Sequence, residues 1–232
     1  MVTATSLGQA ALELLFPSRC FGCGCSGTFL CEACAGLLVP ALPPRCPRCW
    51  EPRSLAGECL TCQLRPPAFD ALRTAFVYDG LARDLVQALK YRGVTALAKR
   101  MGRLLAETAC RYGLVADLVV PVPLSGRRKR TRGYNQAEAL AKGLARDLGL
   151  PAPRGALARR RHTPPQARST GAEARRANVA GAFSADPEAV AGRAVLLIDD
   201  VATTGATLSA CASALREAGA ASVWALTFAR ED

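Results

Sequence analysis

Four pairs of cysteines with the spacing C-x-x-C follow one another in the first third of this 232-residue chain. Nine of the eleven cysteines lie between Cys20 and Cys62. A C-x-x-C turn places two thiolates on one side of a metal ion, and a second pair completes a tetrahedron. The pattern therefore predicts two structural zinc sites. In sequential order, the ligands are Cys20, Cys23, Cys31 and Cys34 for the first site and Cys46, Cys49, Cys59 and Cys62 for the second.

Other uses of these cysteines are less compatible with the sequence. An interleaved pairing has the same spacing and stays open, and Cys25 is left over in either arrangement. A disulfide framework needs an oxidising compartment. The first eighteen residues contain no Lys or Arg, so we expect no secretory leader and a cytoplasmic location. A thioredoxin-like redox site has one such pair beside a βαβ unit, not four in a row. Each predicted zinc site is closed by four thiolates, which indicates a structural role.

Beyond the cysteines, the apolar pattern alternates between strand and helix periods. Strands are predicted over 72–78, 118–122, 194–199 and 222–228. Helices are predicted over 1–17, 79–90, 96–110, 135–148 and 205–218. This alternation indicates an α/β fold with a mainly parallel sheet flanked by helices. We divide the chain into an N-terminal helix with the zinc module, residues 1–66, and an α/β domain, residues 67–232.

The most informative run follows the predicted strand 194–199. It contains Asp199, Asp200, Val201, Ala202, Thr203, Thr204, Gly205, Ala206 and Thr207. In open parallel sheets, ligands bind where strands end, and the next helix offers unpaired N–H groups to a phosphate. Threonine hydroxyls add donors, and Gly205 lets the backbone approach the anion. Asp199 and Asp200 can bind hydroxyls, or a Mg²⁺ ion held in turn by the ligand. The run therefore predicts a site for a ribose 5-phosphate unit.

The positive charge of the chain is concentrated in one segment. The net charge is 30 − 19 = +11, and residues 121–180 alone hold 14 basic and 3 acidic side chains. A local field of this kind attracts phosphates or a nucleic-acid backbone. Only Tyr134 supplies an aromatic ring within the basic run, which disfavours a base-stacking platform there. No apolar stretch approaches the roughly 18 residues that a membrane span needs.

The run from Val195 to Thr207 resembles the signature of type I phosphoribosyltransferases. With four cysteine pairs ahead of it, nearly the whole chain resembles the ComF family of competence-associated phosphoribosyltransferase-like proteins. The matching stretches include Leu14–Pro17, Leu89–Gly93, Val119–Pro123, Arg132–Ala137, Arg175–Asn178 and Phe183. The resemblance implies a type I phosphoribosyltransferase-like fold with a small N-terminal double zinc ribbon.

The same resemblance implies roles for individual residues. It implies that Asp199 and Asp200 are catalytic and hold the ribose hydroxyls of phosphoribosyl pyrophosphate (PRPP), directly or through Mg²⁺. It places the 5-phosphate on Val201, Ala202, Thr203, Thr204, Gly205, Ala206 and Thr207. It implies a pyrophosphate loop of Leu124, Ser125, Gly126, Arg127, Arg128 and Arg130. Arg159–Gln166, with Arg175 and Arg176, resembles the mobile hood of such sites.

Two functions follow from these observations. The first is a Mg²⁺-dependent phosphoribosyltransferase, for which His162, the only histidine, is a candidate general base. The second is a DNA-handling accessory protein that binds single-stranded DNA or a helicase partner and uses the fold to sense a ligand. The family resemblance implies a role in DNA uptake during natural transformation, beside a DNA-translocating helicase.

Overall fold

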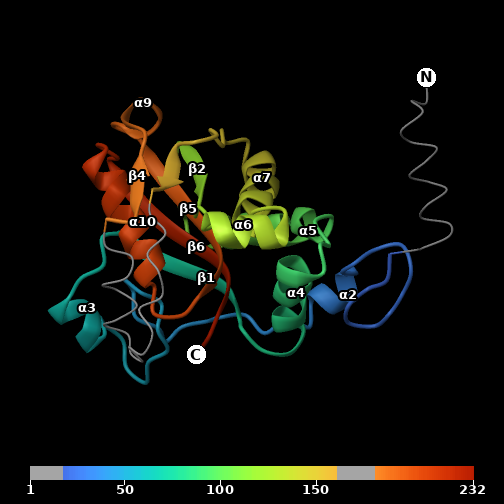
Figure 1. Ribbon diagram of the computed structural model, residues 1–232. Helices are drawn as coiled ribbons and strands as arrows, with labels where there is room; N and C mark the ends of the chain where they lie inside the picture. Colours follow the sequence, from blue (N-terminus) through green and yellow to red (C-terminus); the bar gives the residue numbers. More distant parts are fainter. Residues whose placement is uncertain (1–17, 161–180) are drawn as a thin grey trace.

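The computed structural model describes residues 18–160 and 181–232 of the chain (Figure 1). The helix predicted over 1–17 lies outside the described residues. In chain order the elements are α2 (Glu32–Ala35), α3 (Leu60–Leu64), β1 (Ala71–Val77), α4 (Gly80–Tyr91), α5 (Leu97–Arg111), β2 (Leu118–Pro121), α6 (Gly126–Arg132), α7 (Gln136–Leu148), β3 (Leu157–Arg159), β4 (Phe183–Ala185), α9 (Pro187–Val190), β5 (Ala194–Ala202), α10 (Ala206–Glu217) and β6 (Ser222–Arg230).

Four strands form one parallel sheet in the order β1-β6-β5-β2. The central strand β5 pairs with β6 as far as Ala202, but with β2 only as far as Ile198, opposite Pro121. β3 and β4 form a separate antiparallel pair. The predicted α/β fold with a parallel sheet flanked by helices is confirmed, and β5 extends three residues beyond its predicted end.

Alternate side chains of β5 enter two different cores, as expected for a strand buried on both faces. Leu196 and Ile198 pack with residues of α4, α5 and α7. Val195 and Leu197 pack with residues of α10 and of the β3–β4 pair. Figure 1 shows these two helical layers on either side of the sheet.

A close contact with α5 and the hydrogen bonds of Asn135 together position α7 beside the sheet. A Cβ atom on Gly102 of α5 would lie 2.8 Å from the backbone nitrogen of Leu144, so a side chain there would clash with α7. At the beginning of α7, Asn135 accepts a hydrogen bond from the backbone N–H of Ala137 and donates one to the carbonyl of Val122. The residue before Asn135, Tyr134, is therefore held close to the end of β2.

The cysteine-rich segment covers the free edge of β1. The backbone N–H of Val77 donates to the carbonyl of Val39, and the N–H of Ala41 donates to the carbonyl of Ala75. Such coverage satisfies an otherwise unpaired sheet edge. The segment also divides between the two cores: Cys20 and Cys34 lie with α4 and α5, and Trp50 lies with the opposite core. The division of the chain at residue 66 stays a prediction.

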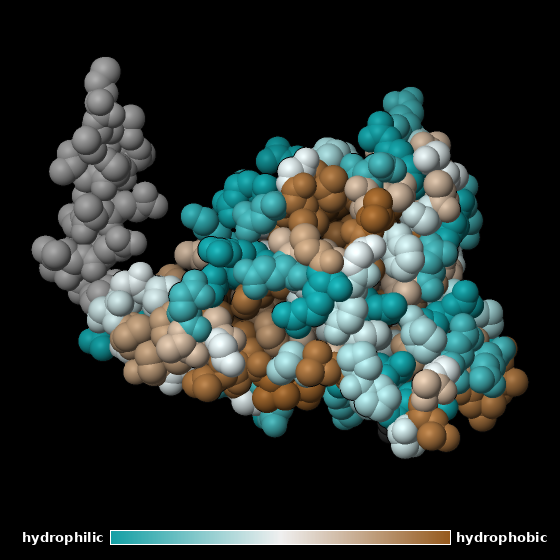
Figure 2. All heavy atoms as spheres, turned by 180° about the vertical axis from the view of Figure 1, so that it is seen from behind, coloured by the Kyte–Doolittle hydropathy of each residue, from teal (hydrophilic) through white to brown (hydrophobic). Residues whose placement is uncertain are grey.

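Within residues 18–160 and 181–232, no helix is both long enough and apolar enough to cross a membrane. Figure 2 shows polar side chains over much of the rear face, with apolar ones gathered in separate patches. The most exposed large apolar residues include Leu37, Leu55, Leu64 and Val115.

Candidate functional site

The two adjacent aspartates lie within β5, at a point where one neighbouring strand has already ended. β2 stops opposite Ile198, whereas β6 continues beside Asp199 and beyond. Val201 and Ala202, predicted as part of a phosphate loop, are the last residues of the strand. The carboxyl end of β5 therefore has one open side, which is where ligands bind in parallel α/β sheets.

Asp199 and Asp200 point to opposite faces of the sheet because successive side chains of a strand alternate. Their joint use on one ligand stays a prediction. Asp199 follows the Val195 and Leu197 side, toward α10, and is partly exposed. Asp200 follows the Leu196 and Ile198 side and is only 3% exposed.

Asp200 is held in a small polar cluster that includes a lysine the sequence did not assign to the site. Lys90, near the end of α4, places Nζ 3.3 Å from Oδ1 of Asp200. The other oxygen, Oδ2, and the hydroxyl of Tyr134 are buried and have no hydrogen-bond partner among the described residues. Burial raises the pKa of the Tyr134 hydroxyl, the positive charge of Arg132 lowers it, and the negative charge of Asp200 raises it further. Two buried polar atoms of this cluster thus lack a partner among the described residues.

The environment of Asp199 favours its neutral form. Burial, and to a smaller extent the negative charge of Asp200, raise the pKa of Asp199 to about 8. The N–H group of Asp200, which donates to Oδ1 of Asp199, and the positive charges of Lys90 and Arg128 only partly oppose this shift. Shifts of this size are common in functional sites, where charges are brought together before a ligand arrives.

The turn after β5 connects the strand to the N-terminus of α10. Gly205 adopts φ of 72°, in the left-handed region that favours glycine, and serves as the N-cap of α10 without a side-chain cap. Oγ1 of Thr204 accepts a hydrogen bond from the N–H of Ala206 at 3.4 Å. Thr207 lies in the first turn of α10. The positive end of this helix is thus presented beside the hydroxyls of the turn.

The predicted pyrophosphate loop is largely a helix. Leu124 and Ser125 precede it, but Gly126–Arg132 form α6, and Oγ of Ser125 accepts a hydrogen bond from the N–H of Arg128. The sequence expectation of a loop is therefore wrong for Gly126, Arg127, Arg128 and Arg130. The Ser125 cap and the left-handed Gly133 at the other end explain why a seven-residue basic stretch can be helical.

None of the residues of α6 is buried, so its five cationic side chains are all at least partly exposed. Within the described parts of the chain, none of the five makes an ion pair with a carboxylate. The structure also brings an exposed aromatic ring to this helix: the guanidinium of Arg132 lies 4.9 Å from the ring centre of Tyr91 and donates to its hydroxyl. Tyr91 is 67% exposed. This contact was not predictable from the sequence, because Tyr91 belongs to α4, about forty residues before Arg132.

Most of the predicted hood lies outside the described residues, including His162, Arg175 and Arg176. Of the first hood stretch, Arg159 and Arg160 are described. Arg159 is the last residue of β3, and its guanidinium lies 5.3 Å from the ring centre of Phe183.

The second group of cysteines assembles as predicted. The Sγ atoms of Cys46, Cys49, Cys59 and Cys62 all lie within 4.8 Å of one another. Burial raises the pKa of Cys46, but the N–H groups of Cys49, Cys59 and Arg48 outweigh burial and lower it to about 7. Thiolates are the form that binds zinc, so the donor set and its polarisation fit the ion.

The first group differs from the prediction, because Cys25 replaces Cys34 among its four mutually close sulfur atoms. Sγ atoms within 4.8 Å of one another belong to Cys20, Cys23, Cys25 and Cys31. Hydrogen bonds with Cys31, together with burial, raise the pKa of Cys34, so its thiol also adjoins the cluster. Five sulfur atoms therefore surround a site that zinc would close with four. The sequential grouping of cysteine pairs holds in both clusters, and the interleaved grouping does not.

The two clusters are repeats of one structure. The N–H of Cys31 donates to Sγ of Cys20, and the N–H of Cys59 donates to Sγ of Cys46 in the same way. In each repeat the first cysteine also pairs through its backbone with the residue five positions later, which is Cys25 in the first cluster and Glu51 in the second. By this correspondence Cys34 matches Cys62, and Cys25 matches Glu51.

Comparisons with known proteins agree with this architecture. Residues 130–231 match the family described as "Phosphoribosyl transferase domain". The chain is 32% identical to "Competence protein F" of Haemophilus influenzae, over 85% of this chain and 89% of that protein. It is 33% identical to "DNA utilization protein YhgH" of Escherichia coli K12, over 78% and 82% of the two chains. It is 30% identical to "Competence protein ComFC" of Bacillus subtilis, over 87% and 84%.

Proposed function

Because the chain belongs to the ComF family, we propose that it binds PRPP or a related sugar phosphate with Mg²⁺ and acts in the handling of DNA taken up by the cell. Residues 130–231, which match the phosphoribosyl transferase domain, contain the proposed site for the ribose 5-phosphate unit.

One observation carries the proposal: the carboxyl end of β5 places carboxylates and an uncapped helix start side by side. Asp199 and Asp200 flank the open side left by β2, and Gly205 lies three residues after the end of the strand. A ligand held there would present its 5-phosphate to the Thr203–Thr207 turn and its ribose hydroxyls to the aspartates. The unpartnered Oδ2 of Asp200 and hydroxyl of Tyr134 would then both be satisfied.

The side chains at this end of the sheet also suit a magnesium ion carried by the ligand. Mg²⁺ prefers a few carboxylate oxygens together with phosphate oxygens and water. Asp199 and Asp200 would supply the carboxylates. When bound, the ion would neutralise charge on the pyrophosphate group.

For phosphoribosyl transfer, the protein would mainly hold the reactants and screen their charge. The bond from C1 of the ribose to the pyrophosphate oxygen breaks, and pyrophosphate leaves with the electron pair. A nucleophilic atom of an acceptor bonds to C1 and releases its proton to solvent or a base. Arg127, Arg128 and Arg130 of α6 would neutralise the departing pyrophosphate, and a carboxylate beside C1 would stabilise the positive charge that develops on the sugar.

The test is calorimetry with PRPP and Mg²⁺ on the wild type, on Asp200→Asn and on Asp84→Asn. Asp84 lies exposed on α4, so its substitution removes the same charge away from the site. Binding that is lost in Asp200→Asn and kept in Asp84→Asn supports the proposal. Absence of binding by the wild type contradicts it. Pyrophosphate release with pooled bases and nucleotides then tests whether the bound ligand is turned over.

A second candidate function, binding of single-stranded DNA, is favoured by α6 and its neighbour Tyr91. Proteins that bind single-stranded nucleic acids combine exposed cations with exposed aromatic rings. The relative named for DNA utilisation adds a reason to test it. Fluorescence anisotropy with labelled single-stranded DNA should show affinity falling steeply with salt. Replacing Arg127, Arg128 and Arg130 by Gln should reduce that slope, and lack of binding at low salt would exclude this function.

A further inference from the structure

A cavity of about 810 Å³ lies between the predicted phosphate turn and the second cysteine cluster. It is lined by Thr203, Thr204 and Gly205 and also by Cys49 and Cys62. The volume is in the range of small-molecule sites. The first cysteine cluster does not border this cavity; it packs with α4 and α5 on the other side of the sheet. The two equivalent clusters therefore stand in different relations to the site.

A short series of contacts joins the second cluster to the turn. The carbonyl of Cys49 accepts a hydrogen bond from Nη1 of Arg230 at 2.9 Å. Arg230, which is 5% exposed, is the register partner of Ala202 at the end of β5. The N–H of Glu231 then donates to the carbonyl of Ala202 at 3.1 Å. The next residue is Thr203, where the turn begins.

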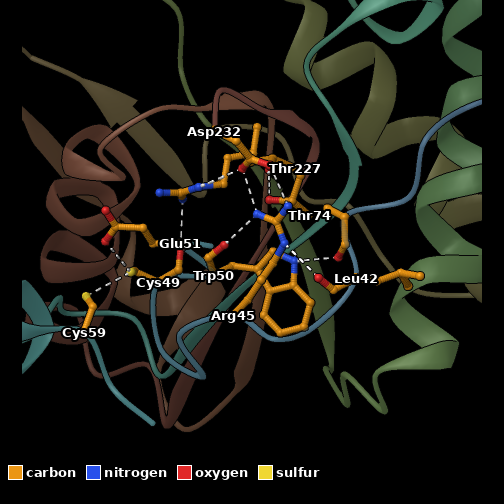
Figure 3. Close-up of polar contacts among 11 residues, drawn as sticks. Leu42, Arg45, Cys49, Trp50, Glu51, Cys59, Thr74, Thr227 and Asp232 are labelled. Atoms are coloured by element: carbon orange, nitrogen blue, oxygen red, sulfur yellow. Dashed lines mark hydrogen bonds and ion pairs between the residues drawn. The ribbon is translucent and has the colours of Figure 1, made fainter. Parts of the chain in front are cut away.

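Asp232 also connects the end of β6 to the second cysteine cluster, through Arg45. Both carboxylate oxygens of Asp232 accept hydrogen bonds from Arg45, at 2.7 and 2.6 Å, and Arg45 also donates to the carbonyl of Trp50 (Figure 3). The segment from Arg45 to Trp50 contains Cys46 and Cys49 of the second cluster. The position of this segment therefore depends on Asp232, which follows β6. Figure 3 shows Cys49 and Cys59 adjoining this network.

We propose that zinc in the second cluster, and not in the first, holds the Thr203–Thr207 turn in its ligand-binding conformation and thereby sets the affinity for a sugar phosphate. This inference rests on the proposed function. The physical reason is that the cluster segment carries few large apolar side chains, so metal binding supplies its order. Without the ion, Cys49 would lose its fixed position, and so would its carbonyl, which accepts the hydrogen bond from Arg230. Arg230 would then no longer hold the end of β5 before Thr203 in place.

The experiment compares Cys49→Ser with Cys23→Ser in the full-length protein, both carrying Cys25→Ser so that Cys25 cannot replace a lost ligand of the first cluster. Each residue is the second cysteine of the first pair in its repeat, so the two substitutions are matched. We expect each variant to lose one of two zinc ions. Calorimetry with PRPP and Mg²⁺ should show at least ten-fold weaker binding by Cys49→Ser and less than a two-fold change in Cys23→Ser. If Cys49→Ser binds PRPP as tightly as the wild type, or if both variants lose affinity equally, the inference is overturned. The proposed function would remain intact in either case. No binding by the wild type would overturn the proposed function itself.

A second measurement covers the case in which Cys49→Ser does not fold. Coupling between two sites is reciprocal, so PRPP must raise the zinc affinity of the second cluster by the factor by which zinc raises the affinity for PRPP. In the variant with Cys23→Ser and Cys25→Ser, which keeps only the second zinc, titration with a competing chelator should give about ten-fold tighter zinc binding when PRPP and excess Mg²⁺ are present. An unchanged zinc affinity at saturating PRPP would overturn the inference.

Discussion

Lys90 and Asp200 form a buried ion pair at the carboxyl end of the central strand, with Nζ 3.3 Å from Oδ1. Their side chains are 17% and 5% exposed. Lys90 comes from the end of α4 and Asp200 from β5, so 110 residues of chain separate them. The pair fixes one oxygen of the carboxylate and leaves the other without a partner among the described residues.

Replacing Lys90 by Met should destabilise the protein strongly. Removal of one partner leaves an uncompensated buried carboxylate, which costs roughly 3–5 kcal/mol. Urea unfolding monitored by circular dichroism measures the loss. Lys90→Arg should lose less, and adding Asp200→Asn to Lys90→Met should recover part of the stability. A loss below about 1 kcal/mol in Lys90→Met would mean that the pair behaves as an exposed one.

The raised pKa of Asp199 predicts a pH-dependent contribution to stability. The folded protein holds the proton up to about pH 8, whereas the unfolded chain releases it near 3.8. The contribution is therefore complete below the lower value and is lost as pH rises through the upper one. In metal-free buffer, the free energy of unfolding of the wild type should fall relative to that of Asp199→Asn between about pH 4 and pH 8.

The exposed variant Asp84→Asn controls for the loss of one negative charge in that comparison. If the difference between the wild type and Asp199→Asn stays constant across the pH range, Asp199 does not hold a proton in the folded state.

The correspondence between the two cysteine clusters predicts which sulfur closes the first zinc site. Cys34 matches Cys62, whereas Cys25 matches Glu51 and lies on the exposed side of the cluster. Cys34→Ser should therefore reduce the zinc content from two ions per chain to one, and Cys25→Ser should leave it at two. Metal analysis after gel filtration measures both. The opposite result would assign the fourth position to Cys25, which lies within 4.8 Å of the other three sulfurs.

The left-handed conformation of Gly205 predicts a modest cost for any side chain there. Gly205→Ala should destabilise the protein by about 1 kcal/mol, because an L-residue is strained at positive φ. The added Cβ would lie 3.7 Å from the Phe69 ring, an ordinary contact, so the effect is conformational. Thermal unfolding measures it. Gly36→Ala is the control, since Gly36 has right-handed helical angles and should tolerate alanine. Equal effects of the two substitutions would contradict the argument.

Much of this fold is readable from the apolar pattern. The strand 194–199 was predictable from its short, continuous apolar run, and the helix 205–218 from apolar residues at helical spacing. The helix α6 was not predictable in the same way. Its seven residues contain no apolar position, and only the cap at Ser125 and the left-handed Gly133 indicate where it begins and ends.

The sequence by itself determined the two cysteine clusters, the parallel α/β layout and the acidic strand end followed by a threonine- and glycine-containing turn, because these depend on residues close together in the chain. The tertiary structure alone decided that Lys90 and Tyr134 adjoin Asp200, and that the second cysteine cluster borders the turn. These relations depend on where β2 ends relative to β5 and on which elements the helical connections bring to the same edge of the sheet. Local periodicity carries no information about either.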